Sequence, residues 1–139
     1  MAVRIEYDAG RRWVLVHASD DLTLDEMLGV LRSARADAEH QMWPMLVDAR
    51  ATRTSLTEED VLRAVEAVRE ALQTQGVRGH VAIVADDNVL FDRLLLYEAR
   101  CAQIGVRVIR VFRQMLDAER WLYIMSATWK FGETRRNAT

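Results

Sequence analysis

The sequence predicts a single-domain α/β sandwich in which a mostly parallel, five-stranded mixed sheet is covered by about four helices. Three observations lead to this fold class. Short apolar runs that suit strands alternate with longer segments whose apolar residues recur every three or four positions, as on one face of a helix. Two of the helical segments open with the same start signal. The 139 residues are enough for one hydrophobic core and imply no second domain.

The chain opens with a predicted hairpin. Residues 3–7 alternate apolar and charged side chains, which indicates a strand with one face in water. Residues 8–11 supply a turn, and residues 13–17 return as a second strand. The first strand is therefore expected to run antiparallel to the second and to lie at or near an edge of the sheet.

Two helices are expected to begin at an N-cap threonine. Thr23 and Thr57 each precede an acidic residue by three positions, which is the spacing of a capping box. The first helix should run to about His40, and Gly76 is placed to end the second in a left-handed conformation. The residues that should face the core on these two helices are Met27, Leu31, Ala34, Ala38, Val61, Val65, Val68 and Leu72.

The stretch 45–50 is predicted to be the central strand. Its three apolar residues are followed by an acid, a small residue and a base, as where a buried strand ends at the polar edge of a sheet. Residues 81–85 indicate another buried strand, followed by a helix over residues 89–104 that Gly105 closes, and by a last strand over residues 106–112. The apolar face of the final helix consists of Met115, Ala118, Leu122, Met125 and Trp129.

Composition argues against several functional classes. The net charge of −2 provides no basic field for nucleic acid and no polybasic segment for anionic lipid. No apolar run is long enough for a transmembrane segment, and the charged first residues do not suit a signal peptide, so we expect a cytoplasmic protein. Cys101 is the only cysteine, which excludes an internal disulfide and a cysteine-rich zinc site. We expect a buried, inert thiol, no cofactor and no metal.

The order of the elements, strand-strand-helix-strand-helix-strand-helix-strand-helix, resembles that of the STAS-like proteins. The residues that carry the resemblance are Leu46-Val47-Asp48-Ala49-Arg50, Ala82-Ile83-Val84-Ala85, Val111-Phe112-Arg113, Ala118 and Trp121-Leu122. More narrowly, the chain is similar to the SpoIIAA-like branch, named for the sporulation anti-sigma-factor antagonist, whose fold is shared with the CRAL-TRIO lipid carriers. The resemblance covers about residues 3–125 and implies a noncatalytic interaction or regulatory module. We expect a domain over residues 1–132 and a flexible tail over residues 133–139.

The resemblance also raises the question of phosphorylation. In the anti-sigma-factor antagonists a phosphorylatable serine lies in an Asp-Ser-Ser/Thr-Gly turn after the central strand. The matching stretch here, residues 53–57, lacks both the acid and the glycine, and Thr54 and Ser55 are the nearest hydroxyls. The carboxylates of residues 58–60 would repel a phosphate there. A plain loop with a helix N-cap is the alternative.

Polar residues are expected together at the carboxyl edge of the sheet, where open α/β folds bind ligands. They are His17, Asp48, Arg50, Asp86, Asp87 and Arg113. Such a group could hold an anion, a metal or a relayed proton. The alternative is structural, because Asp86, Asp87 and Asn88 are good cap residues and Asp48 with Arg50 suits a local ion pair. The sequence has no nucleophile motif, metal-ligand spacing or phosphate-binding glycine loop, so catalysis is not favoured.

The third and fourth helices carry more apolar side chains than one sheet face needs. The candidate interface residues are Phe91, Leu95, Leu96, Trp121 and Trp129. A homodimer interface and packing within the domain both explain them, whereas a membrane-surface helix is disfavoured because the polar face is not basic. A protein partner, or a second copy of the chain, is therefore expected.

Two functions from different classes follow. The first is a noncatalytic interaction or regulatory module that self-associates, which predicts a filled core. The alternative is a binder of a small apolar or amphipathic ligand, lipid-like or a nucleotide, at the carboxyl edge of the sheet. An enzyme is a distant third.

Overall fold

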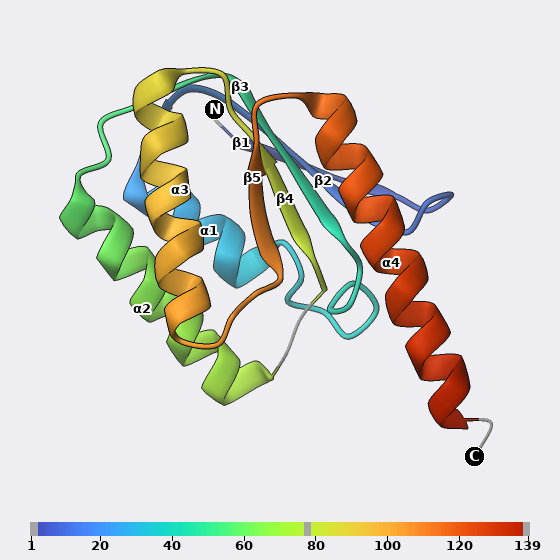
Figure 1. The fold of residues 1–139 in the computed structure, drawn as a ribbon. Coiled ribbons are helices and arrows are strands. Elements are labelled where there is room, and N and C mark those ends of the chain that lie inside the picture. The colour runs from blue at the N-terminus through green and yellow to red at the C-terminus, as the bar shows by residue number, and fades with distance from the viewer. Residues whose placement is uncertain (1–2, 77–78, 138–139) are drawn as a thin grey trace.

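The computed structural model describes residues 3–76 and 79–137, with side chains as far as Ala127 (Figure 1). The elements are β1 (Val3–Asp8), β2 (Trp13–Leu22), α1 (Leu24–Ser33), β3 (Met45–Thr54), α2 (Glu58–Gln75), β4 (Val81–Val84), α3 (Asn88–Gln103), β5 (Ile109–Phe112) and α4 (Met115–Asn137). This order confirms the predicted one. Within the described residues, no helix is long and apolar enough to cross a membrane.

The strands form one sheet in the order β1-β2-β3-β4-β5. β1 pairs antiparallel with β2, and every other neighbouring pair is parallel. The predicted mixed sheet, with β1 antiparallel at an edge and β3 central, is therefore confirmed. A helix between successive parallel strands returns the chain to the same end of the sheet each time, so β2 to β5 all end at one carboxyl edge.

Two layers of helices enclose the sheet. Helices α1, α2 and α3 cover one face, and α4 lies on the other (Figure 1). Because side chains alternate along a strand, each face has its own core. Val16, Ala49 and Ile83 belong to the core under α1 to α3, while Leu46 and Val84 pack with Ala118 and Leu122 of α4.

The predicted helix starts are largely confirmed. Thr57 and Asp60 form a full capping box, since Thr57 Oγ1 accepts from the Asp60 amide at 3.1 Å and Asp60 Oδ2 accepts from the Thr57 amide at 3.0 Å. Thr23 caps α1 through the Glu26 amide. Gly76 and Gly105 lie at helix ends with positive φ angles of 79° and 88°. Gly76 ends α2 as predicted, but its ψ of −170° differs from the predicted left-handed helical conformation.

The predicted end of α1 at His40 is wrong, because the helix stops at Ser33. Arg35 is buried, and its guanidinium Nη1 donates to the carbonyls of Gly79 at 2.7 Å and Trp43 at 3.1 Å. These long-range bonds fold the chain after the helix back against the start of β4. Ala38, which the helical pattern placed in the core, is exposed.

Three strands also differ from the prediction by several residues. β2 and β3 continue to Leu22 and Thr54, because they keep pairing with each other beyond a bulge between His17 and Ser19. β5 begins at Ile109 instead of Val106. Pairing with a neighbouring strand, which single-strand patterns do not report, determines these limits.

Candidate functional site

An apolar cavity of about 180 Å³ lies between the sheet and helices α1 to α3. All five strands and all three helices contribute to its wall. Val16, Val47 and Ile83 line it from the sheet, and Val68 and Leu94 line it from α2 and α3. The lining reaches the surface at Gly76, Gly105 and Arg107, which are exposed. Among the described residues, the cavity therefore reaches the surface beside the end of α2.

Small side chains help to create this space. Ala18 and Ala49 project from the sheet and Ala71 from α2, at lining positions where larger residues would fill the volume. At roughly 24 cal/mol per Å³, a cavity of about 180 Å³ costs about 4 kcal/mol relative to close packing. The sequence pattern did not predict a cavity at these positions. The signal that could have indicated one was the recurrence of alanine on elements that face each other.

The polar groups in the cavity wall are few. Arg35 is only 6% exposed, whereas Arg107 is exposed at the opening. Tyr97 is buried in α3 and hydrogen-bonds through its side chain to Cys101, one turn later. Burial raises the pKa of Tyr97 far above its usual value and the pKa of the Cys101 thiol to about 11. Both groups are therefore neutral at physiological pH.

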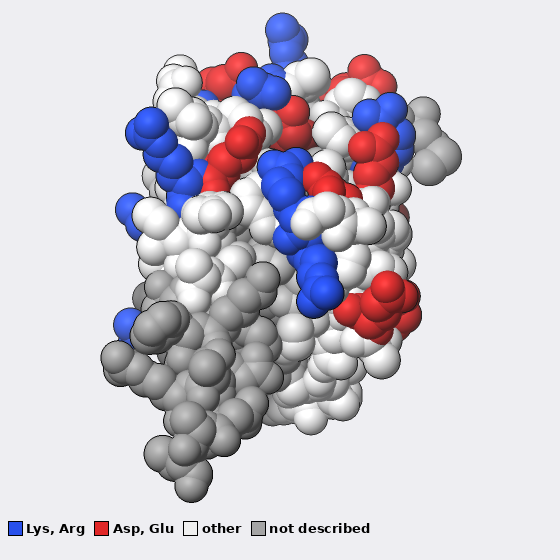
Figure 2. All heavy atoms as spheres, turned by 90° about the vertical axis from the view of Figure 1, so that its right-hand side faces the viewer, with Lys and Arg blue, Asp and Glu red and all other residues white. Residues whose placement is uncertain are grey.

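The predicted carboxyl-edge group lies on the other face of the sheet. His17, Asp48, Arg50 and Asp86 line an open hollow of about 450 Å³ there. Figure 2 shows charged side chains of both signs gathered over the upper part of the α4 face. The structure thus brings four of the six predicted residues to one place. The apolar cavity lies on the opposite face of the sheet from these residues, whereas a ligand was expected at the carboxyl edge.

Within this hollow Asp48 is already paired. Arg50 donates from Nε to Oδ1 and from Nη2 to Oδ2, each at 2.9 Å, and the Arg50 amide lies 3.2 Å from Oδ1. These hydrogen bonds lower the pKa of Asp48 despite partial burial. His17 Nε2 lies 3.6 Å from Glu6 Oε2. Asp48 and Arg50 therefore form a local ion pair at the surface, which is the structural alternative stated above.

Asp87 and Arg113, the other two predicted residues, do not line the hollow. Asp87 is the N-cap of α3 and accepts from the Leu90 amide at 3.0 Å. Arg113 donates to Asn88 Oδ1 at 2.9 Å, and its guanidinium lies 4.0 Å from the centre of the Phe91 ring. Their observed contacts hold the start of α3 in place.

The two candidate phosphorylation sites have different surroundings. Thr54 Oγ1 donates to the Leu22 carbonyl at 3.0 Å and accepts from the Leu56 amide at 2.9 Å, so it links β2 to the turn before α2. Ser55 is exposed, and its hydroxyl donates to Asp21 Oδ2 at 3.1 Å. A phosphate on Ser55 would meet the Asp21 carboxylate as well as the acidic start of α2. Phosphorylation at either residue stays a prediction.

The predicted interface residues lie in different layers. Phe91, Leu95 and Leu96 are on α3, with Leu95 the most exposed of the three at 37%, while Trp121 lies on α4 across the sheet. Trp121 packs near Phe112 and His80, with ring centres 5.7 and 5.5 Å away. The side chain of Trp129 lies outside the described residues. The α3 residues and Trp121 therefore cannot belong to one flat surface.

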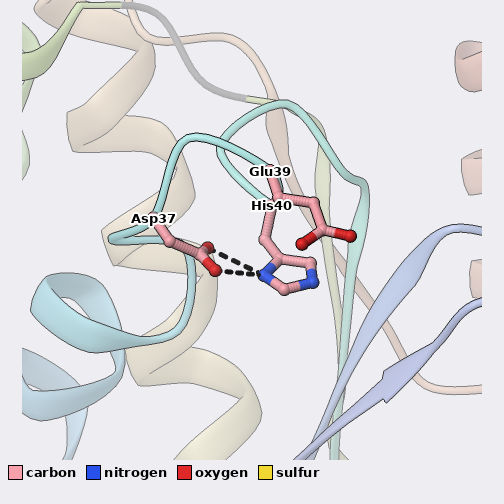
Figure 3. Close-up of side chains that lie close together, drawn as sticks. All are labelled: Asp37, Glu39 and His40. Carbon is pink, nitrogen blue, oxygen red and sulfur yellow. Dashed lines mark hydrogen bonds and ion pairs between the residues drawn. The ribbon is translucent and has the colours of Figure 1, made fainter.

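A further polar cluster, which was not among the predicted site residues, lies after α1. Asp37, Glu39 and His40 have ligand-type atoms within 4.8 Å of one another, and His40 Nδ1 lies 2.7 Å from both carboxylate oxygens of Asp37 (Figure 3). The His40 ring also stacks on Tyr7 at 4.1 Å and meets Trp43 edge-on at 4.6 Å. These contacts explain the ring's position as a link between β1 and the loop after α1.

Comparison with known proteins gives a weak structural likeness. No protein-family model matches the chain, and no curated protein does. Among solved structures, the chain is similar to an uncharacterized protein from the DUF3478 family with a SpoIIAA-like fold from Shewanella loihica PV-4. The two share 21% sequence identity, with 87% of this chain and 92% of the other covered and a TM-score of 0.49. That description names the fold that the sequence resemblance implied. A likeness at this level supports no statement about a ligand, partner or activity.

Proposed function

We propose that this protein is a noncatalytic module that binds a small apolar or amphipathic molecule in the cavity between the sheet and helices α1 to α3. The observation that carries the proposal is the cavity itself, at about 180 Å³ and lined almost entirely by aliphatic side chains. Apolar cavities of about 150 Å³ stay dry and take up molecules such as benzene. A ligand here would need a tail of similar size.

The energetics favour occupation over an empty space. The empty cavity forgoes about 4 kcal/mol of packing and transfer energy, by the volume relation applied to about 180 Å³. A ligand recovers part of this energy when its apolar atoms leave water, at about 0.8 kcal/mol per methylene. The way out near Gly76 and Gly105 would allow exchange without unfolding of the sheet.

The direct test is a titration with hexanol and hexanoate, followed by amide NMR spectra and calorimetry. We expect at least one probe to bind and to shift signals of lining residues such as Val47 and Ile83. Ala71→Leu, which places a larger side chain in the cavity, should abolish binding. Ala67→Leu is the matched control, because Ala67 is half-buried one turn earlier on α2 and is not among the described lining residues. Failure of both probes to bind the wild-type protein would refute the proposal.

A second candidate is the self-associating interaction or regulatory module, and the exposed side of α4 favours it. Leu116, Tyr123 and Ile124 are more than half exposed there, at 57%, 72% and 58%. An apolar surface of this kind is typical of contacts between proteins. α4 packs mainly on β3, β4 and β5, which leaves the same sheet face more open towards β1.

Light scattering coupled to size-exclusion chromatography tests this second candidate. A dimer that Tyr123→Lys dissociates would support it. Leu62→Lys is the control, because Leu62 is a similarly exposed apolar residue on α2, on the opposite face of the sheet. A strict monomer at high concentration would count against self-association.

A further inference from the structure

The apolar cavity extends across the whole width of the sheet. Its described lining includes Val3 of β1 at one edge of the sheet and Ile109 of β5 at the other, together with residues of the three strands between them. Neighbouring strands lie about 4.8 Å apart, so these two edge strands are separated by roughly 19 Å. A sphere of about 180 Å³ would be only about 7 Å across, which is less than half of that span. The cavity is therefore a long, narrow channel and not a compact pocket.

The register of the sheet gives the direction of this channel. At one end Val3 pairs with Ala18, which lies towards the carboxyl end of β2. At the other end Ile109 is in register, through β4 and β3, with Val14 of β2. Val14 precedes Ala18 by four residues, which is about 13 Å along the strand. The channel therefore crosses the strands obliquely, from the carboxyl end of β2 to the amino end of β5.

The described wall is aliphatic in each part of the channel. Leu22 and Met27 line the end near β1 and β2, Val47 and Ile83 line the middle, and Val108 lines the end near β5. Apolar atoms thus find van der Waals partners along the whole length. An extended hydrocarbon chain has the same properties as this space, because it is long, narrow and apolar.

We infer that the ligand of this cavity carries an unbranched hydrocarbon chain, which lies across the strands from the β1 and β2 end towards β5. This inference rests on the proposed function and specifies the shape class of its ligand. Each methylene of a chain can leave water and contact the wall at its own level of the channel. A branched or cyclic group with the same number of carbons is wider, so the channel would have to expand, and overpacking of a core is unfavourable.

Calorimetric titration with alcohols tests the shape. From butanol to hexanol, the affinity should rise about fourfold for each added methylene. Hexanol should bind at least about fivefold more tightly than its branched isomer 3,3-dimethylbutan-1-ol, after correction for their partition between water and octanol, because overpacking costs at least that factor. The two isomers have the same carbons and the same hydroxyl, so the corrected difference reports the shape of the tail.

Larger side chains at the two ends test the length. Val3 and Val108 are both half-buried in the described lining, one at each end. Val3→Phe and Val108→Phe should each weaken the binding of octanol more than that of butanol, because a short chain can still occupy the remaining part of the channel. Val89→Phe is the matched control, since Val89 is 55% exposed on α3 and is not among the described lining residues. It should change neither affinity.

The outcomes separate this inference from the proposed function. Equal corrected affinities for hexanol and its branched isomer would overturn the chain inference and leave the proposed function intact. End variants that leave octanol binding unchanged, or that weaken butanol and octanol equally, would also overturn it. Absence of binding by hexanol and hexanoate would instead refute the proposed function. Circular dichroism must show that each end variant folds, and the comparison of the isomers decides the question in the wild-type protein if neither does.

Discussion

Ala71→Leu should stabilise the ligand-free protein, although most core substitutions destabilise. Ala71 lies on α2 and lines the cavity, so a leucine there extends into empty space. Each added methylene-sized group contributes about 0.8 kcal/mol when it leaves water, which gives roughly 2 kcal/mol for the added atoms. The whole cavity of about 180 Å³ costs about 4 kcal/mol, so this gain fits within what filling can recover. We expect a net stabilisation of about 1–2 kcal/mol.

Urea unfolding followed by circular dichroism measures this gain. The midpoint should rise while the slope with denaturant stays constant, because the fold and its buried surface hardly change. Ala67→Leu, half-buried on the same helix but not among the described lining residues, should leave the midpoint nearly unchanged. Equal gains in both variants would mean that leucine stabilises α2 by burying apolar surface outside the cavity, because alanine already has the higher helix propensity. A loss in Ala71→Leu alone would mean that the cavity cannot accept the side chain.

Three further predictions concern other parts of the fold. Thr52 is 2% exposed, and its hydroxyl lacks a hydrogen-bond partner among the described residues. Thr52→Val should therefore stabilise the protein by about 1 kcal/mol in urea unfolding. Thr54→Val should destabilise it by at least about 1 kcal/mol, because that substitution breaks two hydrogen bonds. Arg50→Ala should destabilise by less than about 1 kcal/mol at neutral pH. Arg50 lowers the folded-state pKa of Asp48 below its ordinary 3.8. The difference in unfolding free energy between the wild type and Arg50→Ala should therefore shrink as the pH falls through the folded-state pKa, and a constant difference in acid would contradict the pairing. Cys101 is buried with a pKa raised to about 11, so a thiol reagent at mildly alkaline pH should label it only as fast as the protein opens, and immediate labelling would show that the thiol is accessible.

Local sequence patterns predicted some features of the candidate site and missed others. The grouping of His17, Asp48, Arg50 and Asp86 followed from the sequence, because parallel strands must end at one edge. The pairing of Asp48 with Arg50 was an alternative that only the tertiary structure could decide. The apolar cavity was not predicted, because the sequence pattern of an apolar face is the same whether the facing element packs against it or leaves a space.

The sequence alone determined the order of the elements, the hairpin, the central strand at Met45 and the caps at Thr23 and Thr57. Those features depend on neighbours within a few residues, through alternation, helical spacing and hydrogen bonds to nearby amides. Only the tertiary structure decided where α1 ends and that the core contains a cavity. Both depend on residues far apart in the chain. Arg35 donates a hydrogen bond to the Gly79 carbonyl, and the side chains of three helices do not fill the space between the helices and the sheet. Packing is a property of facing surfaces, and a single strand or helix specifies only one of them.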